Sequence, residues 1–170
     1  MEKVAKFSKV SLEQFTKDWT NLFASEENIQ EIYDNIPLPK RATAGSAGYD
    51  FFAPIAITLM PKESIFMPTG IRVEIKEGWL LALFPRSGLG IKYRLQLDNT
   101  AGIIDSDYYF AQNEGHIMAK ITNDTNEDKV LNIAAGQGFM QGIFLSYGIC
   151  IDDEASEQRI GGFGSTDQKN

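Results

Sequence analysis

The sequence predicts a mainly β protein, a jelly roll or distorted β-barrel, with a short helical addition before it and a flexible tail after it. Three observations support this prediction. After residue 39, short apolar runs are broken about every 8–12 residues by Gly, Pro or Asn, as in β-sandwiches and jelly rolls. Before residue 37, apolar residues recur at helical spacing. From residue 152, the chain is polar and then glycine-rich. We therefore expect three parts, residues 1–37, 38–151 and 152–170.

Two helices are predicted in the first part, and both are expected to be packing elements. Between Ser11 and Ala24 one helix face carries the apolar residues Leu12, Phe15, Trp19, Leu22 and Phe23. Ser11, with Gln14 three positions later, predicts a capping box at its start. A second, weaker pattern begins at Ser25 and ends before Pro37. Its apolar residues are Ile29, Ile32, Tyr33 and Ile36.

The predicted strands follow from the apolar runs after residue 39. They are residues 55–60, 64–68, 70–75, 79–85, 116–123, 129–136 and 139–148. Pro54, Pro61 and Pro68 fall at the ends of such runs, where a missing ladder donor is tolerated. A chain of 170 residues corresponds to about one domain. It buries roughly 70% of its surface, so its core needs no disulfide.

Composition excludes several classes of function. The net charge of −7, from 16 Lys and Arg against 23 Asp and Glu, opposes sequence-independent binding to nucleic acid. A small polyanion remains possible where donors or a divalent cation gather. The single His116 excludes an HExxH zinc site, and the single Cys150 excludes an intrachain disulfide or cysteine zinc cluster. Acid–base chemistry therefore falls to carboxylates.

The ends of the chain carry no membrane signal. The N-terminus is charged, and no stretch approaches the ~18 uncharged residues that span a bilayer. We expect a cytoplasmic protein that interacts with neither membrane nor nucleic acid.

Four short segments could carry chemistry. Residues 159–166, RIGGFGST, combine glycines, hydroxyls, a cation and an aromatic ring, and residues 85–90, PRSGLG, place an arginine after a buried run. Glycines allow backbone N–H groups to approach phosphate, and arginine offers a planar fork that suits it. The alternatives are a solvated tail and an ordinary turn with a surface arginine.

The other two segments are acidic. Residues 98–108, DNTAGIIDSDY, hold Asp105 and Asp107, which would share a face if the backbone were extended, so that one could act as a base. A solvated acidic turn is the alternative. In residues 47–53, AGYDFFA, Asp50 lies among apolar neighbours, where an unpaired charge is costly. Asp50 therefore needs a partner or a function.

Taken in their order along the chain, and together with residues 136–144, GQGFMQGIF, these segments resemble the five motifs of the trimeric dUTPase family. AGYDFFA is similar to the first motif, PRSGLG to the second, GIIDSDY with the upstream Asn99 to the third, GQGFMQGIF to the fourth and RIGGFGST to the fifth. The resemblance covers about residues 38–166. It implies a dUTPase-like jelly roll that forms a homotrimer with shared active sites.

The resemblance also implies roles for residues of the third motif. Gly102, Ile103 and the amide of Asn99, on a β-hairpin, would hydrogen-bond uracil. Tyr108 would pack beneath the deoxyribose and leave no space for a 2′-hydroxyl. A wrong shape or an unpaired buried polar group is costly enough to give large rate ratios.

The implied reaction is hydrolysis of dUTP to dUMP and pyrophosphate, which keeps uracil out of DNA and supplies dUMP. Asp105 would activate water for attack at the α-phosphorus. A Mg²⁺ ion bound mainly by the phosphates would have one water held by Asp50. The residues implied to contact the phosphates or close over the substrate are Arg86, Ser87, Gly88, Gln141, Arg159, Phe163, Gly164, Ser165 and Thr166.

This sequence departs from the family pattern at several positions. Arg159 is one residue nearer Phe163 than in many members, and Asp167 stands where glycine is usual. Gly138 replaces an arginine found in many members. The loop after Tyr108 is lengthened. His116 follows that loop, outside the motifs, and we expect a structural or surface role for it.

Two alternatives remain beside dUTP hydrolysis. The related dCTP deaminases need a glutamate shortly after the Arg-Ser of the second motif, and residues 88–91, GLGI, offer none. The second alternative is a regulatory role, alone or in addition to catalysis. The N-terminal helices or the loop after Tyr108 would then dock a protein partner such as a repressor.

Overall fold

The structure, a computed structural model, describes residues 1–24, 28–157 and 161. Its strands are β1 (Ala5–Lys9), β2 (Lys40–Arg41), β3 (Tyr49–Phe52), β4 (Ile57–Leu59), β5 (Ser64–Pro68), β6 (Ile71–Ile75), β7 (Trp79–Pro85), β8 (Leu95–Leu97), β9 (Gly102–Ile104), β10 (Met118–Asn123), β11 (Leu131–Ile133) and β12 (Gly138–Ser146). Its helices are α1 (Leu12–Phe23), α2 (Ile29–Asn35), α3 (Ser87–Tyr93) and the 3-10 helix η1 (Ser106–Phe110). The prediction of a mainly β fold is confirmed.

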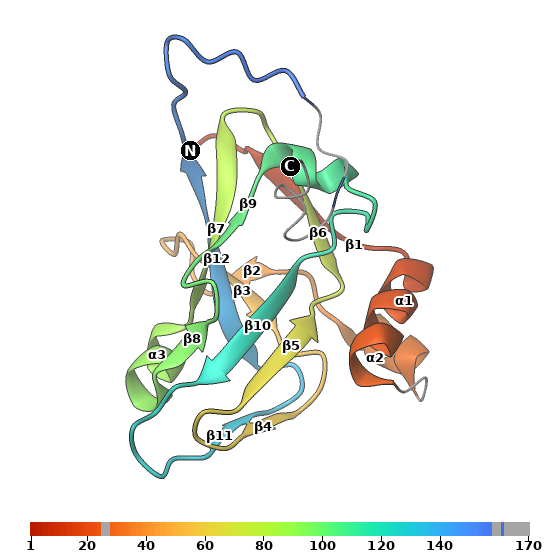
Figure 1. Ribbon diagram of the computed structural model, residues 1–170, viewed down its shortest axis with the longest axis vertical. Helices are drawn as coiled ribbons and strands as arrows, with labels where there is room; N and C mark the ends of the chain where they lie inside the picture. Colours follow the sequence, from red (N-terminus) through yellow and green to blue (C-terminus); the bar gives the residue numbers. More distant parts are fainter. Residues whose placement is uncertain (25–27, 158–160, 162–170) are drawn as a thin grey trace, which may run out of the picture.

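Four antiparallel groups of strands form the body (Figure 1). The largest is a five-stranded sheet in the order β2-β3-β12-β7-β9. A three-stranded sheet has the order β5-β10-β8, and the remaining strands pair as β1-β6 and β11-β4. Every predicted apolar run overlaps one of these strands. The long β12 lies at the centre of the five-stranded sheet, where it pairs with both β3 and β7.

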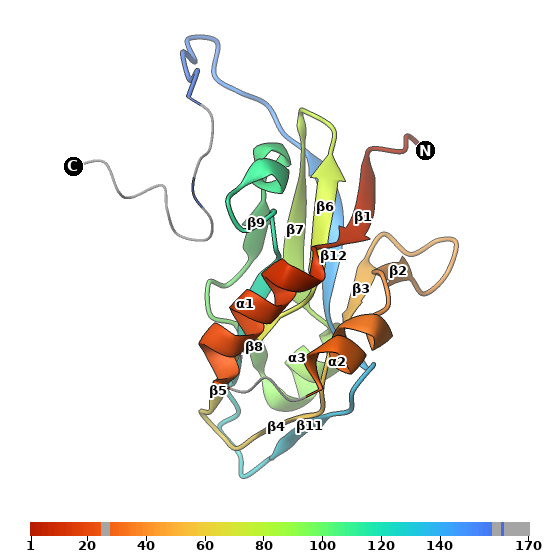
Figure 2. The same cartoon turned by 90° about the vertical axis from the view of Figure 1, so that its right-hand side faces the viewer.

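The two N-terminal helices pack against the body and share its core (Figure 2). Phe15 and Trp19 of α1 are 0% and 4% exposed, and their ring centroids lie 5.4 Å apart. Ser11 caps α1 as predicted, because its Oγ accepts a hydrogen bond from the Gln14 N–H at 3.1 Å. The second helix begins after Asn28, later than predicted, and residues 25–27 lie outside the described residues. Both helices are packing elements, as expected.

A strand that the sequence did not predict precedes the helices. β1 pairs antiparallel with β6, in a register that places Ala5 opposite Ile75 and Lys9 opposite Ile71. Phe7 is the large apolar residue of β1, and its ring lies 5.8 Å from that of Phe51. A five-residue strand with one large apolar side chain has too weak a pattern to be recognised alone. The residues before α1 therefore belong to the β body.

Two further elements differ from the sequence prediction. Residues 87–93 form α3, although their two glycines disfavour a helix and indicated only a turn. The predicted hairpin of the third motif is realised differently, since β8 pairs with β10 whereas β9 pairs with β7. The turn between β8 and β9 thus links two sheets. None of the described helices has the length and apolar character needed to cross a membrane.

Candidate active site

Residues of the first, second and fourth motifs meet at one end of the five-stranded sheet. Gln141 on β12 lies opposite Asp50 on β3 and opposite Phe84 on β7. Directly opposed residues of neighbouring strands share a sheet face, so these three side chains project to the same side. The alternate residues, such as Phe51 and Leu83, are 1% exposed and face the core. The alternation therefore directs the polar side chains of Asp50 and Gln141, from two distant segments, to one surface.

Asp50 finds its partner in Arg86, at the end of β7. The Arg86 Nε lies 3.3 Å from the Asp50 Oδ1, and the two side chains are 43% and 17% exposed. Arg86 also donates a long hydrogen bond of 3.5 Å to the Gly138 carbonyl. A Cβ at Gly138 would lie 2.8 Å from Arg86 Nη1, so the missing side chain leaves the space that the guanidinium occupies. Gly138, which stands where many family members carry arginine, therefore leaves room for Arg86 of the second motif.

Gln141 is held close to the same pair. Its Nε2 donates a 3.4 Å hydrogen bond to the Pro85 carbonyl. On its other side a Cβ at Gly48 would lie 2.5 Å from the Gln141 Oε1, so the amide lies close against this glycine and a larger residue would displace it. Ser87 and Gly88 are exposed at the start of α3, directly after Arg86. This end of the sheet thus gathers a guanidinium, an amide, a hydroxyl and a carboxylate.

Residues of the third motif lie around β9. Gly102 lies opposite Leu83 of β7, and a Cβ at Gly102 would be 3.1 Å from the Leu83 Cδ1. Gly102 and Asn99 border a cavity of about 190 Å³ whose other lining residues are Phe66, Leu83, Leu97, Asp98, Met118, Ala119 and Lys120. Ile103 is 52% exposed. The lining residues of β5 and β10 were not predicted from the sequence, because those strands carry no motif. Only the strand order brings them to this cavity.

Asp105 directly follows β9 and is half-buried. Its backbone is extended, but η1 begins at the next residue, so Asp107 lies within a helical turn. The two carboxylates therefore do not alternate along an extended strand, and the geometry under which they would share a face is absent. Asp105 alone remains the candidate base.

Tyr108 lies within η1 and is 4% exposed. Its hydroxyl donates to the His116 carbonyl at 2.9 Å and accepts from the Asn113 Nδ2 at 2.9 Å. His116 is 0% exposed, so the structural role expected for it is confirmed. The lengthened loop after Tyr108 thus folds back to hold the tyrosine.

The two groups of residues lie far apart within one chain. Ile104 is opposite Leu81 of β7, so the next residue, Asp105, lies beside Leu80. Arg86 is six residues after Leu80 along the chain. At ~3.3 Å per strand residue, the separation is roughly 20 Å. Asp105 therefore does not meet the Asp50 and Arg86 pair in the same chain.

The remaining predicted residues have no described position. Arg159, Phe163, Gly164, Ser165 and Thr166 lie outside the described residues. Within the described part of the chain, no three His, Cys, Asp or Glu side chains gather as a metal cage would require. A cation at Asp50 would therefore need most of its ligands from substrate and water.

Comparison with known proteins agrees with the motifs. A family model described as dUTPase matches residues 34–166. The chain belongs to the dUTPase family. The deoxyuridine 5'-triphosphate nucleotidohydrolase of Lactococcus lactis is 40% identical over 134 residues, which are 77% of this chain and 88% of the relative. That of Hahella chejuensis is 39% identical over 148 residues, covering 82% and 93%.

Solved dUTPases share the fold. The crystal structure of the Streptococcus mutans dUTPase matches with a TM-score of 0.61 at 32% identity, and the match covers 85% of this chain and 97% of that one. A mutant dUTPase of Staphylococcus bacteriophage 80alpha matches with the same TM-score at 19% identity, covering 92% and 98%. The latter supports the fold alone. With its relatives, this dUTPase is an enzyme of the dUTP diphosphatase class.

Proposed function

We propose that this dUTPase hydrolyses dUTP to dUMP and pyrophosphate in sites that are shared between the chains of a homotrimer. The observation that carries the proposal is the separation along β7. Asp105 lies alongside one end of β7, and Asp50 and Arg86 lie roughly 20 Å away at the other. A ligand that needs both groups must receive them from different chains. In a symmetric oligomer each chain provides one group to one site and the other group to a neighbouring site, so there are as many complete sites as chains.

The nucleoside would bind at β9 and the turn before it. Asn99 and the backbone of Gly102 and Ile103 would hydrogen-bond uracil, and the cavity beside Asn99 and Gly102 supports this placement. A cytosine amino group would leave donors unmatched at such contacts, at a cost of about 1–3 kcal/mol for each buried group. Tyr108, held through its hydroxyl, would pack beneath the deoxyribose and exclude a ribose.

Asp105 would act as the general base. Its carboxylate takes a proton from a water molecule, whose oxygen attacks the α-phosphorus in line. The bond from that phosphorus to the bridging oxygen of the β-phosphate breaks, and pyrophosphate leaves. The products are dUMP and pyrophosphate, without a covalent intermediate. Asp105 is half-buried after β9, so its carboxylate remains accessible to a water molecule.

The phosphates would bind at the other end of the sheet of a neighbouring chain. Arg86 provides a planar fork, and Ser87, Gly88 and Gln141 add a hydroxyl, a backbone N–H and an amide. A lone carboxylate fits Mg²⁺ that arrives with a triphosphate, because this ion keeps several waters and uses few protein ligands. Asp50 would hold one such water. When bound, the ion spreads the negative charge of the phosphates.

The fifth motif completes the proposed site. Phe163 would stack on uracil, while Arg159, Gly164, Ser165 and Thr166 would close over the phosphates and exclude water. With these residues in place, the substrate would be enclosed by three chains.

One assay tests the proposed function. Purified protein is incubated separately with each dNTP and with UTP, with and without Mg²⁺, and pyrophosphate is measured. We expect rapid release from dUTP, release from the other nucleotides that is slower by orders of magnitude, and neither without Mg²⁺. Light scattering coupled to size-exclusion chromatography should give three times the 18.9 kDa chain mass. Equal hydrolysis of dCTP, or an active monomer, would contradict the proposal.

A further inference from the structure

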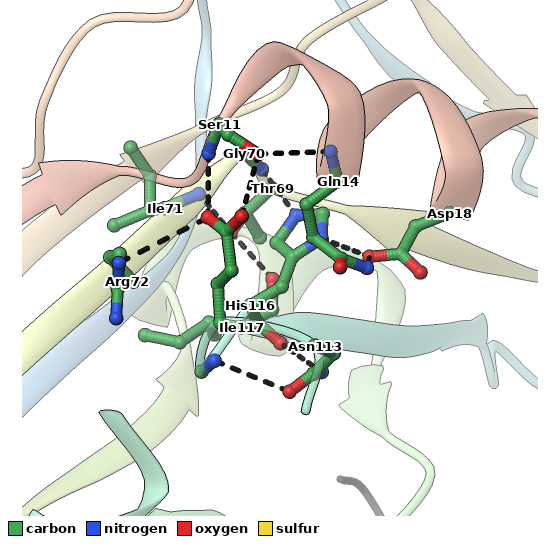
Figure 3. A network of polar contacts seen from close by, with 12 residues as sticks. Ser11, Gln14, Asp18, Thr69, Gly70, Ile71, Arg72, Asn113, His116 and Ile117 are labelled. Atoms are coloured by element: carbon green, nitrogen blue, oxygen red, sulfur yellow. Dashed lines mark hydrogen bonds and ion pairs between the residues drawn. The ribbon is translucent and has the colours of Figure 1, made fainter. Parts of the chain in front are cut away.

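The first helix is joined to the loop after Tyr108 by a buried histidine (Figure 3). The His116 Nδ1 lies 2.6 Å from the Asp18 Oδ2 of α1, and the same oxygen accepts a 2.9 Å hydrogen bond from the Gln14 Nε2. The other ring nitrogen, Nε2, accepts a 2.8 Å hydrogen bond from the Gly70 N–H. This arrangement assigns the ring proton to Nδ1, which donates to Asp18.

A second link lies about two helical turns earlier, at the start of α1. Glu114, in the same loop, accepts hydrogen bonds from the N–H of Ser11 at 2.7 Å and from its hydroxyl at 2.6 Å. Ser11 is the N-cap of α1, so the loop is tied to the start of the helix. Arg72 lies 4.0 Å from Glu114 and donates at 2.7 Å to the Tyr109 carbonyl. The helix and the loop are therefore joined at two positions.

The loop transmits this restraint to Tyr108. His116, whose ring contacts Asp18, also provides the backbone carbonyl that accepts a hydrogen bond from the Tyr108 hydroxyl. Gly115, with φ +70°, lies between the two anchors, and a Cβ there would be 2.6 Å from the Tyr108 carbonyl oxygen. The loop therefore passes close to the Tyr108 backbone at a position where only glycine fits. Tyr108 is therefore restrained by polar contacts that begin on α1.

We propose that α1 is a brace for the nucleoside side of the active site, with Asp18 and His116 as positioning residues for Tyr108. The inference rests on the proposed role of Tyr108 beneath the sugar. The His116 ring is 0% exposed and both its nitrogens are engaged, so it has few alternative positions. Loss of the Asp18 carboxylate leaves a buried N–H without its acceptor. The loop and the tyrosine ring then gain freedom, and the distinction between deoxyribose and ribose weakens.

The test compares wild type with Asp18→Ala, Asp18→Asn and Glu13→Ala. The asparagine retains an oxygen that accepts from His116, and Glu13 is an exposed residue of the same helix. The first readout is the ratio of kcat/KM for dUTP to that for UTP. The second is the ring signal of Tyr108 in ligand-free protein carrying ¹³C-labelled tyrosine, assigned with Tyr108→Phe.

We expect Asp18→Ala to shift the Tyr108 signal and to lower the selectivity ratio roughly 10-fold. Asp18→Asn should recover most of the ratio, and Glu13→Ala should match wild type. An unmoved Tyr108 signal, or equal loss of activity on both substrates, would overturn the inference. If Asp18→Ala does not fold, Glu114→Gln decides by the same two readouts, since it weakens the second link without altering α1.

The two readouts separate this inference from the proposed function. A wild type that hydrolyses dUTP and UTP equally would refute the sugar-excluding role of Tyr108. In that case the NMR signal of Tyr108 alone would decide whether α1 restrains this tyrosine.

Discussion

Asp50 on β3 and Arg86 at the end of β7 form an ion pair across β12, with 3.3 Å between Oδ1 and Nε. The strand between them contributes Gln141, and it also contributes Gly138, whose missing side chain leaves room for the guanidinium. A single ion pair whose cation is 43% exposed to solvent adds little to stability. Its geometry instead keeps a cation and a carboxylate side by side at the surface where we propose that phosphates bind.

Gly138→Ala should therefore reduce activity more than stability. The new Cβ would lie 2.8 Å from Arg86 Nη1 and would push the guanidinium away from Asp50. We expect kcat/KM for dUTP to fall roughly 10-fold, with a melting temperature close to wild type. Gly45→Ala is the matched control, because no heavy atom lies within 4 Å of a Cβ there. Unchanged activity of Gly138→Ala would show that the position of Arg86 is not critical.

Asp105→Asn should abolish turnover and leave binding nearly intact. An amide cannot take the proton from water, but it has almost the same size as the carboxylate. Calorimetric titration with a non-hydrolysable dUTP analogue should give an affinity close to that of wild type. Survival of more than a few per cent of the rate would show that Asp105 is not the base.

Mixed trimers should recover activity from two inactive variants. Asp105→Asn and Arg86→Ala chains, co-expressed with different tags, assemble together if the protein is a trimer. A site shared between neighbours is intact only when one chain supplies Arg86 and the other supplies Asp105. Random assembly makes about one quarter of the sites intact. The measured rate should approach that fraction of wild type, whereas sites contained within single chains would give none.

Removal of residues 158–170 should strongly reduce activity without changing the melting temperature. The deletion removes the whole fifth motif, and we propose that this motif closes over the substrate rather than supporting the core. The rate of pyrophosphate release and the thermal unfolding curve provide the two measurements. A large fall in melting temperature would instead assign the tail a structural role.

The helix-to-loop links should make stability depend on pH. Burial raises the pKa of Asp18, but hydrogen bonds from His116 and Gln14, with the charge of Lys17 nearby, outweigh it and lower the pKa below its ordinary 3.8. Burial likewise raises the pKa of Glu114, yet Ser11, Arg72 and His116 lower it below 4.5. The unfolded chain therefore binds these protons at higher pH than the folded chain.

The stabilising contribution of both carboxylates is complete above about pH 5 and is lost as the pH falls through their folded pKa values. Urea unfolding at fixed protein concentration, measured between about pH 3 and pH 6, should show the loss. Glu114→Gln should flatten this dependence, with Glu13→Gln as a charge control on the exposed face of α1. An identical slope in Glu114→Gln and wild type would argue against the link.

The structure also changes how the N-terminal segment should be tested for partner binding. Deletion of residues 1–36 would remove β1 from its pairing with β6 and Phe15 from the core. Loss of a buried phenylalanine side chain alone costs about 3–5 kcal/mol. Substitutions at exposed positions of α1, such as Lys17, therefore probe a docking role without removing part of the fold.

Local patterns predicted many of the elements, and the resemblance to the dUTPase motifs suggested the site residues. The ordered motifs suggested Asp50, Arg86, Gln141 and Asp105 as site residues. Apolar runs predicted β4 to β7 and β10 to β12 but not the other strands, and Ser11 with Gln14 predicted the start of α1. These signals lie within about ten consecutive residues, because the periods of helices and strands are local properties of the backbone.

Only the tertiary structure decided which of these residues meet. Asp50 and Arg86 come together because β3, β12 and β7 are neighbours, and Asp105 lies at the opposite end because β9 runs antiparallel to β7. His116, outside every motif, is joined to Asp18 across 98 residues. Strand order and register arise from the burial of the whole core rather than from any one segment. The sequence by itself therefore determined the chemical groups, and the packing of distant segments determined their geometry.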